Sequence, residues 1–149
     1  MPTATEKVNF IPKGYHTVTP YLTVKGAGPM IDFLKKAFGA TETFRMPGPN
    51  GTVMHAEIQI GDSRIMTGDA RGEYEPIPGQ LYLYVDDCDR YYKQAIAAGG
   101  TKFREPETQF YGDRHGAVKD MCGNIWWVAT HVEDVSEEEM QKRMKAMKG

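Results

Sequence analysis

The chain contains two stretches, about sixty residues apart, that match one another, and this repeat narrows the possible folds more than any other feature. His55 to Ile58 aligns with His115 to Val118, and Ile65 aligns with Ile125. In residues 112–134, β-branched and aromatic residues flank the turn-forming sequence Asp-Met-Cys-Gly-Asn, which is typical of two strands joined by a tight turn. The repeat therefore predicts a duplicated unit rich in strands.

Apolar periodicity predicts the same order of elements in each repeat, a strand, a helix and then three strands. The first repeat has them at 17–24, 29–39, 41–46, 53–60 and 63–68, and the second at 80–85, 87–98, 101–104 and in two strands from Gly112 onward. Pro29 suits the first helical residue, Asp87 suits an N-cap, and glycines follow both helices. We expect an α+β fold in which two tandem βαβββ modules, about 15–69 and 79–131, form curved mixed sheets.

The last segment predicts a helix over about 136–148. Ser136 and Glu139 have the spacing of a capping box, in which each side chain bonds the other residue's backbone amide. Met140, Met144 and Met147 form a narrow apolar stripe, which indicates docking against the body or against a neighbouring subunit. We expect residues 1–149 to form a single domain, because a chain of 149 residues is long enough to bury a substantial core.

Composition excludes several classes of partner. The 18 basic and 20 acidic side chains are nearly balanced and scattered, so nucleic acid is not an expected partner. No apolar run approaches the ~18 residues of a membrane span, and the first residues do not resemble a signal peptide, so we expect a cytoplasmic protein with no membrane partner. Cys88 and Cys122 stand singly, which predicts reduced thiols.

Two tandem modules, with the turn at 120–124 before the last strand, resemble the vicinal-oxygen-chelate superfamily of glyoxalase I, extradiol dioxygenases and bleomycin-resistance proteins. Three longer motifs, at 55–66, 112–114 and 129–134, look more narrowly like its PhnB-type, glyoxalase-like branch. The resemblance implies a cavity enclosed by the curved sheets. It also implies a homodimer, in which the modules pair within one chain or are swapped between chains.

In the metal-using members of this superfamily, four ligands come from the first and last strand of each module. The matching positions here are Thr19, Met66, Gln80 and Trp127. Only Gln80 can bind a divalent metal, and a site of this kind needs at least three converging N or O donors. We therefore expect no metal at this place and no cofactor.

Strand parity indicates which side chains face the cavity, on the side opposite the helix-packed face. These are Thr19, Tyr21, His55, Glu57, Gln59, Tyr82, Tyr84, His115, Lys119 and Trp127. Trp126 then points into the core. Aromatic walls with a few polar groups are typical of a small-molecule site. The ligand-binding candidates are Tyr21, His55, Glu57, Tyr82, Tyr84, Asp113, Arg114, His115 and Trp127.

Two residue pairs leave alternatives open. His55 and Glu57 can act as a general acid–base pair or as metal ligands, or they are polar residues facing a wet cavity. Asp113 and Arg114 can anchor a ligand, or they fix their own loop by an ion pair or by backbone hydrogen bonds. The sequence favours a metal-independent protein that binds an aromatic or amphipathic molecule. The alternative is a glyoxalase-like lyase or isomerase that uses His55 and Glu57, with or without a displaced metal.

Overall fold

The computed structural model describes residues 7–148, so residues 1–6 and 149 of the expected domain 1–149 lie outside the described part. The elements, in chain order, are β1 (Tyr21–Val24), α1 (Ala27–Phe38), β2 (Thr41–Pro47), a 3-10 turn (Pro49–Gly51), β3 (Val53–Ile60), β4 (Ser63–Asp69), β5 (Gln80–Tyr84), α2 (Cys88–Ala97), β6 (Thr101–Thr108), β7 (Asp113–Lys119), β8 (Ile125–His131) and α3 (Glu137–Lys148).

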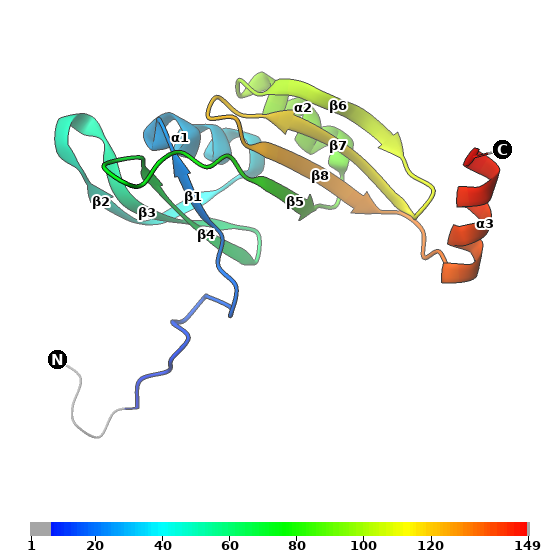
Figure 1. Cartoon of the computed structure of the whole chain (residues 1–149), viewed down its shortest axis with the longest axis horizontal. Helices are drawn as coiled ribbons and strands as arrows, with labels where there is room; N and C mark the ends of the chain where they lie inside the picture. Colours follow the sequence, from blue (N-terminus) through cyan, green and yellow to red (C-terminus); the bar gives the residue numbers. More distant parts are fainter. Residues whose placement is uncertain (1–6, 149) are drawn as a thin grey trace.

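The strands form two four-stranded sheets with the same internal order, β1-β4-β3-β2 and β5-β8-β7-β6 (Figure 1). The first and last strands of each module pair in parallel, and the other neighbours pair antiparallel. This arrangement confirms an α+β fold made of two tandem βαβββ modules with mixed sheets. A parallel pair needs a crossover connection, and in each module a helix forms part of it.

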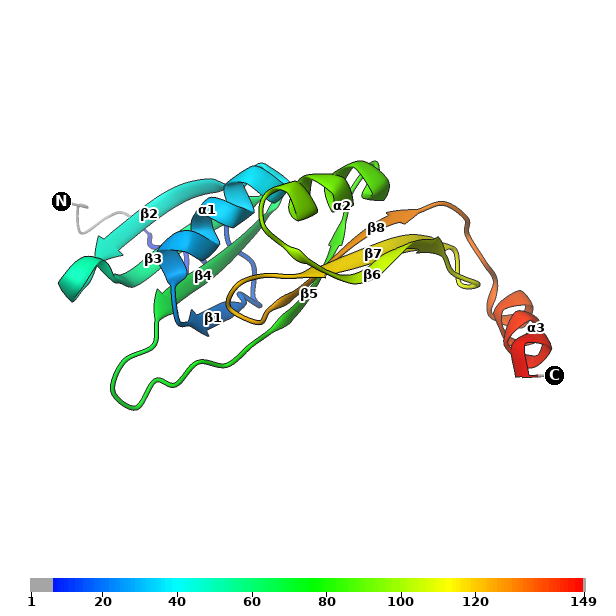
Figure 2. The same ribbon diagram turned by 90° about the horizontal axis from the view of Figure 1, so that it is seen from above.

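The helices α1 and α2 lie on the same side of the molecule and each covers its own sheet (Figure 2). The two modules share one core, in which Phe38 of α1 packs against Trp126 of β8 with ring centroids 5.6 Å apart. Gly39 ends α1 in the left-handed conformation, and the Asp87 side chain caps α2 by accepting from the Arg90 amide, both as expected. Among residues 7–148, no helix covers the opposite face of either sheet.

Several boundaries differ from the sequence prediction, and β6 continues to Thr108, four residues beyond its predicted end at Arg104. The first strand starts at Tyr21 instead of Thr17, because its pairing with β4 begins at Tyr21 and Met66. The first helix starts at Ala27, two residues before Pro29. Oδ1 of Asp69, at the end of β4, accepts hydrogen bonds of 2.8 and 2.9 Å from the amides of Gly26 and Ala27, which satisfies donors at the start of the helix.

The register of the repeat also needs a correction. Ile58 pairs with Ile65 in the first module, whereas the corresponding Val118 pairs with Trp126 in the second. The spacing between equivalent residues of the two modules is therefore one residue longer after the turn between β7 and β8 than before it. Ile65 corresponds to Trp126 and not to Ile125. In the same way Met66 corresponds to Trp127, since they pair with Tyr21 and Tyr82.

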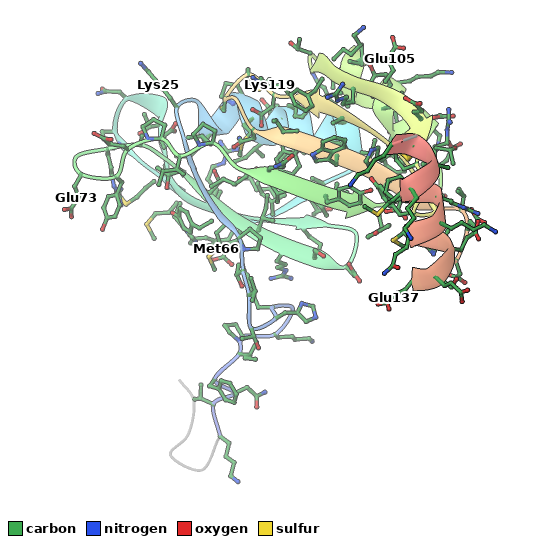
Figure 3. The ribbon with its side chains drawn as sticks, turned by 45° about the vertical axis from the view of Figure 1, so that its right-hand side comes forward. Lys25, Met66, Glu73, Glu105, Lys119 and Glu137 are labelled. Carbon is green, nitrogen blue, oxygen red and sulfur yellow. The ribbon has the colours of Figure 1, made fainter. Side chains whose placement is uncertain are left out.

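Helix α3 stands apart from the two modules (Figure 1), and Glu137 at its start lies at the other side of the molecule from Glu73 (Figure 3). Half of the expected capping box is present, because Oγ of Ser136 accepts from the Glu139 amide at 3.1 Å. The Glu139 carboxylate instead accepts from Arg143.

Most of the methionine stripe on α3 is not docked on the body of this chain, since Met144 and Met147 are exposed and only Met140 is half-buried. Of the two alternatives, docking on a neighbouring subunit stays a prediction. Within residues 7–148, none of the helices combines the length and the apolar character needed to cross a membrane.

Candidate functional site

The helix-free face of each sheet carries a cluster of aromatic and titratable side chains. We call the two faces face 1, on the first module, and face 2, on the second. Strand parity holds at the tandem tryptophans, since Trp126 is fully buried in the core whereas Trp127 is half-buried on face 2. Face 1 carries Tyr21, His55 and Glu57, and face 2 carries Tyr82, Tyr84, Asp113, His115 and Trp127.

On face 1 the two catalytic candidates are hydrogen-bonded, with Nε2 of His55 2.9 Å from Oε2 of Glu57. The Tyr21 hydroxyl lies 3.2 Å from Nδ1 of the same imidazole, and Tyr15 donates to Glu57 from the N-terminal segment. The hydrogen bonds from Tyr15 and His55 lower the pKa of Glu57. In the neutral ring, Nε2 therefore carries the proton and Nδ1 accepts from Tyr21. Both nitrogens of His55 are occupied.

On face 2 the centre of the cluster is Asp113, which is only 5% exposed. Its Oδ2 accepts from the hydroxyls of Tyr82 and Tyr84, each at 3.0 Å, and its Oδ1 is 2.9 Å from Nδ1 of His131. Burial opposes ionisation, but the bonds from His131 and the two tyrosines outweigh it, so the pKa of Asp113 is lowered. Burial, together with the bond to Asp113, raises the pKa of Tyr82, and the bond to Asp113 is the main cause of the raised pKa of Tyr84 and of His131.

Aromatic rings surround His115 on the same face. Its ring centroid is 4.6 Å from that of Trp127, and Tyr82 stacks on Trp127 at 6.1 Å with an interplanar angle of 29°. Phe103 meets the other side of the indole edge-on at 6.0 Å. Burial lowers the pKa of His115, opposed by the charges of Asp113 and Glu107, so the imidazole is neutral near pH 7.

A cavity of about 790 Å³ opens beside the edge strand β5. Its walls include Tyr82 and Tyr84 on one side and the β3–β4 turn with Arg64 on the other. The resemblance implied a cavity enclosed by the curved sheets. In the single chain this cavity lies at the junction of the modules instead, and it shares the two tyrosines with face 2. Its volume falls within the range that accommodates drug-sized ligands, about 300–1,000 Å³.

Arg114 is the one ligand-binding candidate that the structure does not bring to either face. It alternates with Asp113 and His115 along β7, so it points to the opposite side, where its Nε donates to Asp89 of α2 at 3.1 Å. One of the two alternatives for Arg114 was an ion pair that fixes its own loop. The structure shows an ion pair, but its partner is Asp89 on α2 and not the neighbouring Asp113.

Three hydrogen-bonding residues of these clusters were not identified from the sequence, namely Tyr15, Tyr111 and His131. Tyr15 and Tyr111 come from segments without regular structure, where no periodicity indicates the direction of a side chain. His131 pairs with Asp113 across β7 and β8, and only the strand register brings the two together. Among the wider set expected to face the cavity, Gln59 bonds Arg64 and Lys119 is exposed at the end of β7 (Figure 3).

The four positions that match the metal ligands of the metal-using members offer few suitable donor atoms. Met66, labelled in Figure 3, has a thioether and Trp127 an indole, neither of which suits a hard divalent cation. The carbonyl oxygen of Gln80 already accepts from the Trp127 indole, and Thr19 bonds the His16 carbonyl. Across residues 7–148, no group of three or more His, Cys, Asp or Glu side chains is arranged to hold a metal.

Comparison with known proteins agrees with this fold. Residues 15–128 match the family model described as "Glyoxalase/Bleomycin resistance protein/Dioxygenase superfamily". The uncharacterized proteins Mb0911c of Mycobacterium bovis and Rv0887c of Mycobacterium tuberculosis are both 33% identical to the chain over 140 residues, covering 87% of it and 92% and 82% of their own lengths.

Two solved structures illustrate the shared fold. TioX from Micromonospora sp. ML1 superimposes with a TM-score of 0.63 at 23% identity, covering 77% of this chain and 99% of its own. The fosfomycin resistance protein FosX from Mesorhizobium loti has a TM-score of 0.58 at 17% identity, covering 85% and 97%. The family match spans both βαβββ modules, and the chain belongs to the glyoxalase/bleomycin-resistance/dioxygenase superfamily.

Proposed function

We propose that the protein is a metal-independent binder of a small aromatic or amphipathic molecule, similar to the bleomycin-resistance and PhnB-type members of its superfamily. The observation that carries this proposal is the aromatic cluster of face 2. Trp127, Tyr82 and His115 contact one another, and Tyr82 also lines the cavity of about 790 Å³.

The chemistry of this cluster suits binding by stacking. Indole and phenol rings present flat surfaces that favour planar or cationic ligands, and the hydroxyl and imidazole groups fix orientation. Tyr82 is 41% and Tyr84 66% exposed, so a ligand can reach both rings. The proposed ligand-binding set is Tyr21, His55, Glu57, Tyr82, Tyr84, Asp113, His115 and Trp127.

Metal independence is supported by the donor set, because the four positions that would hold the ion contribute at most one suitable ligand atom and that atom is already bonded. Binding by stacking and hydrogen bonding requires no metal. A cytoplasmic location remains part of the proposal, and the two unpaired thiols, Cys88 and Cys122, are consistent with a reducing compartment.

We also propose that the chain acts as one domain and as a homodimer. Faces 1 and 2 are open in the single chain, and apolar side chains stand exposed on the N-terminal segment, at Val8, Phe10 and Val18, and on α3. Exposed apolar surface of this kind favours association between subunits. Sedimentation should give a dimer at micromolar concentration, and a monomer there would contradict this part of the proposal.

The function is tested by metal analysis followed by a ligand screen. Protein purified without chelator should contain no stoichiometric transition metal. A panel of planar aromatic compounds, tested together with the glycopeptide bleomycin, should contain members that raise the melting temperature, because a ligand that binds only the folded state stabilises it. A stoichiometric metal, or a panel that leaves the melting temperature unchanged throughout, would contradict the proposal.

The second candidate, a lyase or isomerase, is favoured by one contact, the 2.9 Å hydrogen bond between His55 and Glu57. The lowered pKa keeps Glu57 ionised at neutral pH, so its role would be to orient His55 as a base toward the Tyr21 hydroxyl. Turnover that is lost in Glu57→Gln while aromatic binding on face 2 persists would favour this candidate.

A further inference from the structure

Nε2 of His115 makes no hydrogen bond to any group in residues 7–148, although the side chain is only partly exposed. The other ring nitrogen, Nδ1, lies 2.9 Å from the Tyr82 hydroxyl and 3.4 Å from that of Tyr111. One nitrogen of the imidazole is therefore held by the protein and the other is available.

The hydrogen-bond network decides which nitrogen carries the proton. An ionised Asp113 can only accept, so Tyr82 donates its single proton to Oδ2 of Asp113. The Tyr82 oxygen then has only lone pairs to offer to Nδ1 of His115. Their 2.9 Å separation is a hydrogen bond only if Nδ1 carries the proton. In the neutral ring, Nε2 is consequently an unprotonated acceptor, a tautomer assigned from the network.

The surroundings of His115 favour a neutral ring with an available lone pair. Burial lowers the pKa of His115 despite the carboxylates of Asp113 on β7 and Glu107 on β6. The chain of donors from His115 through Tyr82 ends at a buried carboxylate, and hydrogen bonds in such a chain polarise one another. Trp127, whose ring centroid is 4.6 Å from that of His115, provides a flat surface beside the imidazole.

We propose that Nε2 of His115 accepts a hydrogen bond from the ligand while the ligand ring stacks on Trp127. The ligand class is then a flat aromatic or heteroaromatic molecule with an N–H or O–H donor at its edge. This inference rests on the proposed binding function and adds the chemical class of the ligand. His55 cannot take the same part without rearrangement, because Glu57 and Tyr21 occupy its two nitrogens.

Indole and 1-methylindole form a matched pair of probes, since they have the same ring system and only indole has an N–H donor. We expect calorimetric titration of the full-length protein at pH 7.5 to show indole binding about fivefold more tightly, the usual net effect of one neutral hydrogen bond. Equal affinities would overturn the inference and leave the binding function standing. If neither probe binds at millimolar concentration, the inference fails, and the binding function fails with it only if the whole panel of compounds also leaves the melting temperature unchanged.

Two variants locate the preference at His115. His115→Phe keeps a ring beside Trp127 but removes the acceptor, so the ratio of the two affinities should fall to about one while both probes still bind. Tyr82→Phe removes the hydroxyl that fixes the tautomer and should reduce the ratio. Tyr92→Phe is the matched control, because Tyr92 on α2 makes no contact with His115, and it should keep the wild-type ratio. An indole preference that survives in a folded His115→Phe protein would overturn the inference.

A measurement on the wild-type protein tests the same point without a mutation. Nitrogen-15 NMR of the His115 imidazole should show a protonated Nδ1 and an unprotonated Nε2, and indole should shift the Nε2 signal more than 1-methylindole does. A proton on Nε2 in the neutral ring would contradict the assignment and, with it, the inference.

Discussion

The two modules place a histidine at the same point of the repeat, and they bind it in opposite ways. In the first module the carboxylate of Glu57 lies two residues after His55, whereas in the second the carboxylate of Asp113 lies two residues before His115. In both a tyrosine of the first strand bonds Nδ1, Tyr21 in one and Tyr82 in the other. Because the carboxylate lies at a different position, the neutral ring carries its proton on Nε2 in His55 and on Nδ1 in His115.

This difference separates the roles of the two faces. Glu57 bonds Nε2 of His55 directly, so the polar groups of face 1 satisfy one another. Asp113 reaches its histidine only through Tyr82, which leaves Nε2 of His115 for a ligand. The second difference is at the last strand, where Met66 of face 1 corresponds to Trp127 of face 2. The repeat thus carries one self-contained polar cluster and one aromatic face, and the aromatic face is the one that we propose binds the ligand.

The largest loss of unfolding free energy is expected from substitution of the tandem tryptophans. These substitutions test whether Trp126 belongs to the core and Trp127 to face 2. Trp126→Ala should lower the free energy of unfolding by about 3–5 kcal/mol, because it removes a buried ring that packs on Phe38. Its Nε1 also donates to Asp120 at 2.8 Å. Trp127→Ala should cost clearly less, because that ring is half-exposed. Urea denaturation measures both, and a more destabilised Trp127→Ala would reverse the assignment.

The carboxylates provide the next test. Asp113→Asn should lower the free energy of unfolding by about 1.5–3 kcal/mol, the usual contribution of a hydrogen bond to a charged group, since two tyrosines and His131 bond this buried side chain. Glu57→Gln is the counterpart on face 1. Its carboxylate is more exposed, at 23% against 7%, so we expect a smaller loss. Equal losses in urea would show that the two clusters are energetically alike.

Exchanging Trp127 for the residue of the first module sharpens the comparison further. Trp127→Met should leave the fold intact, because methionine occupies the same position on β4. It should weaken the binding of planar probes such as 1-methylindole by about 1 kcal/mol, the stacking contribution of an aromatic pair beyond its buried area. Met66→Leu is the control on face 1. If calorimetry shows that Trp127→Met retains wild-type affinity, face 2 is not the stacking surface.

Much of this architecture can be predicted from the sequence, since period-two alternation identifies the strands, and glycines with the Asp87 cap identify the helices. Parity alone separates Trp126 from Trp127. The one-residue difference between the hairpins could not be predicted, because the four residues between Gln59 and its partner Arg64 and the five between Lys119 and its partner Ile125 both fit the same repeat. The early start of α1 was missed because the groups that cap it come from Asp69, more than forty residues away along the chain.

The site was predicted less completely than the fold. Residue types indicated a polar aromatic face. The tautomer of a histidine, however, depends on which group bonds each ring nitrogen, and residue types do not specify this. The pairing of Asp113 with His131 and the contact of Tyr15 with Glu57 are long-range contacts that no local pattern indicates. Arg114 was a ligand-binding candidate because of its residue type, yet it lies outside the site. Side chains alternate along a strand, so Arg114 points to the helix side of the sheet.

The smallest expected effect is the pH dependence contributed by the pair Asp113 and His131 in the second module. The pKa of Asp113 is lowered in the folded state, so its stabilisation is present above its unfolded pKa, about 4, and is lost as the pH falls through the folded value. The pKa of His131 is raised by Asp113 and Asp134, so its stabilisation is present below its unfolded pKa, about 6.5, and is lost as the pH rises through the folded value. The pair should therefore contribute most between about pH 4 and pH 6.5.

His131→Gln keeps a hydrogen-bonding side chain but cannot be protonated, and it isolates this contribution. The difference in unfolding free energy between wild type and His131→Gln, measured in urea, should be largest near pH 5.5 and should shrink toward pH 8. His16→Gln is the matched control, since His16 makes no ion pair among the described residues, and its difference from wild type should vary less with pH. A constant His131→Gln difference across this range would mean that Asp113 is held by the tyrosines alone.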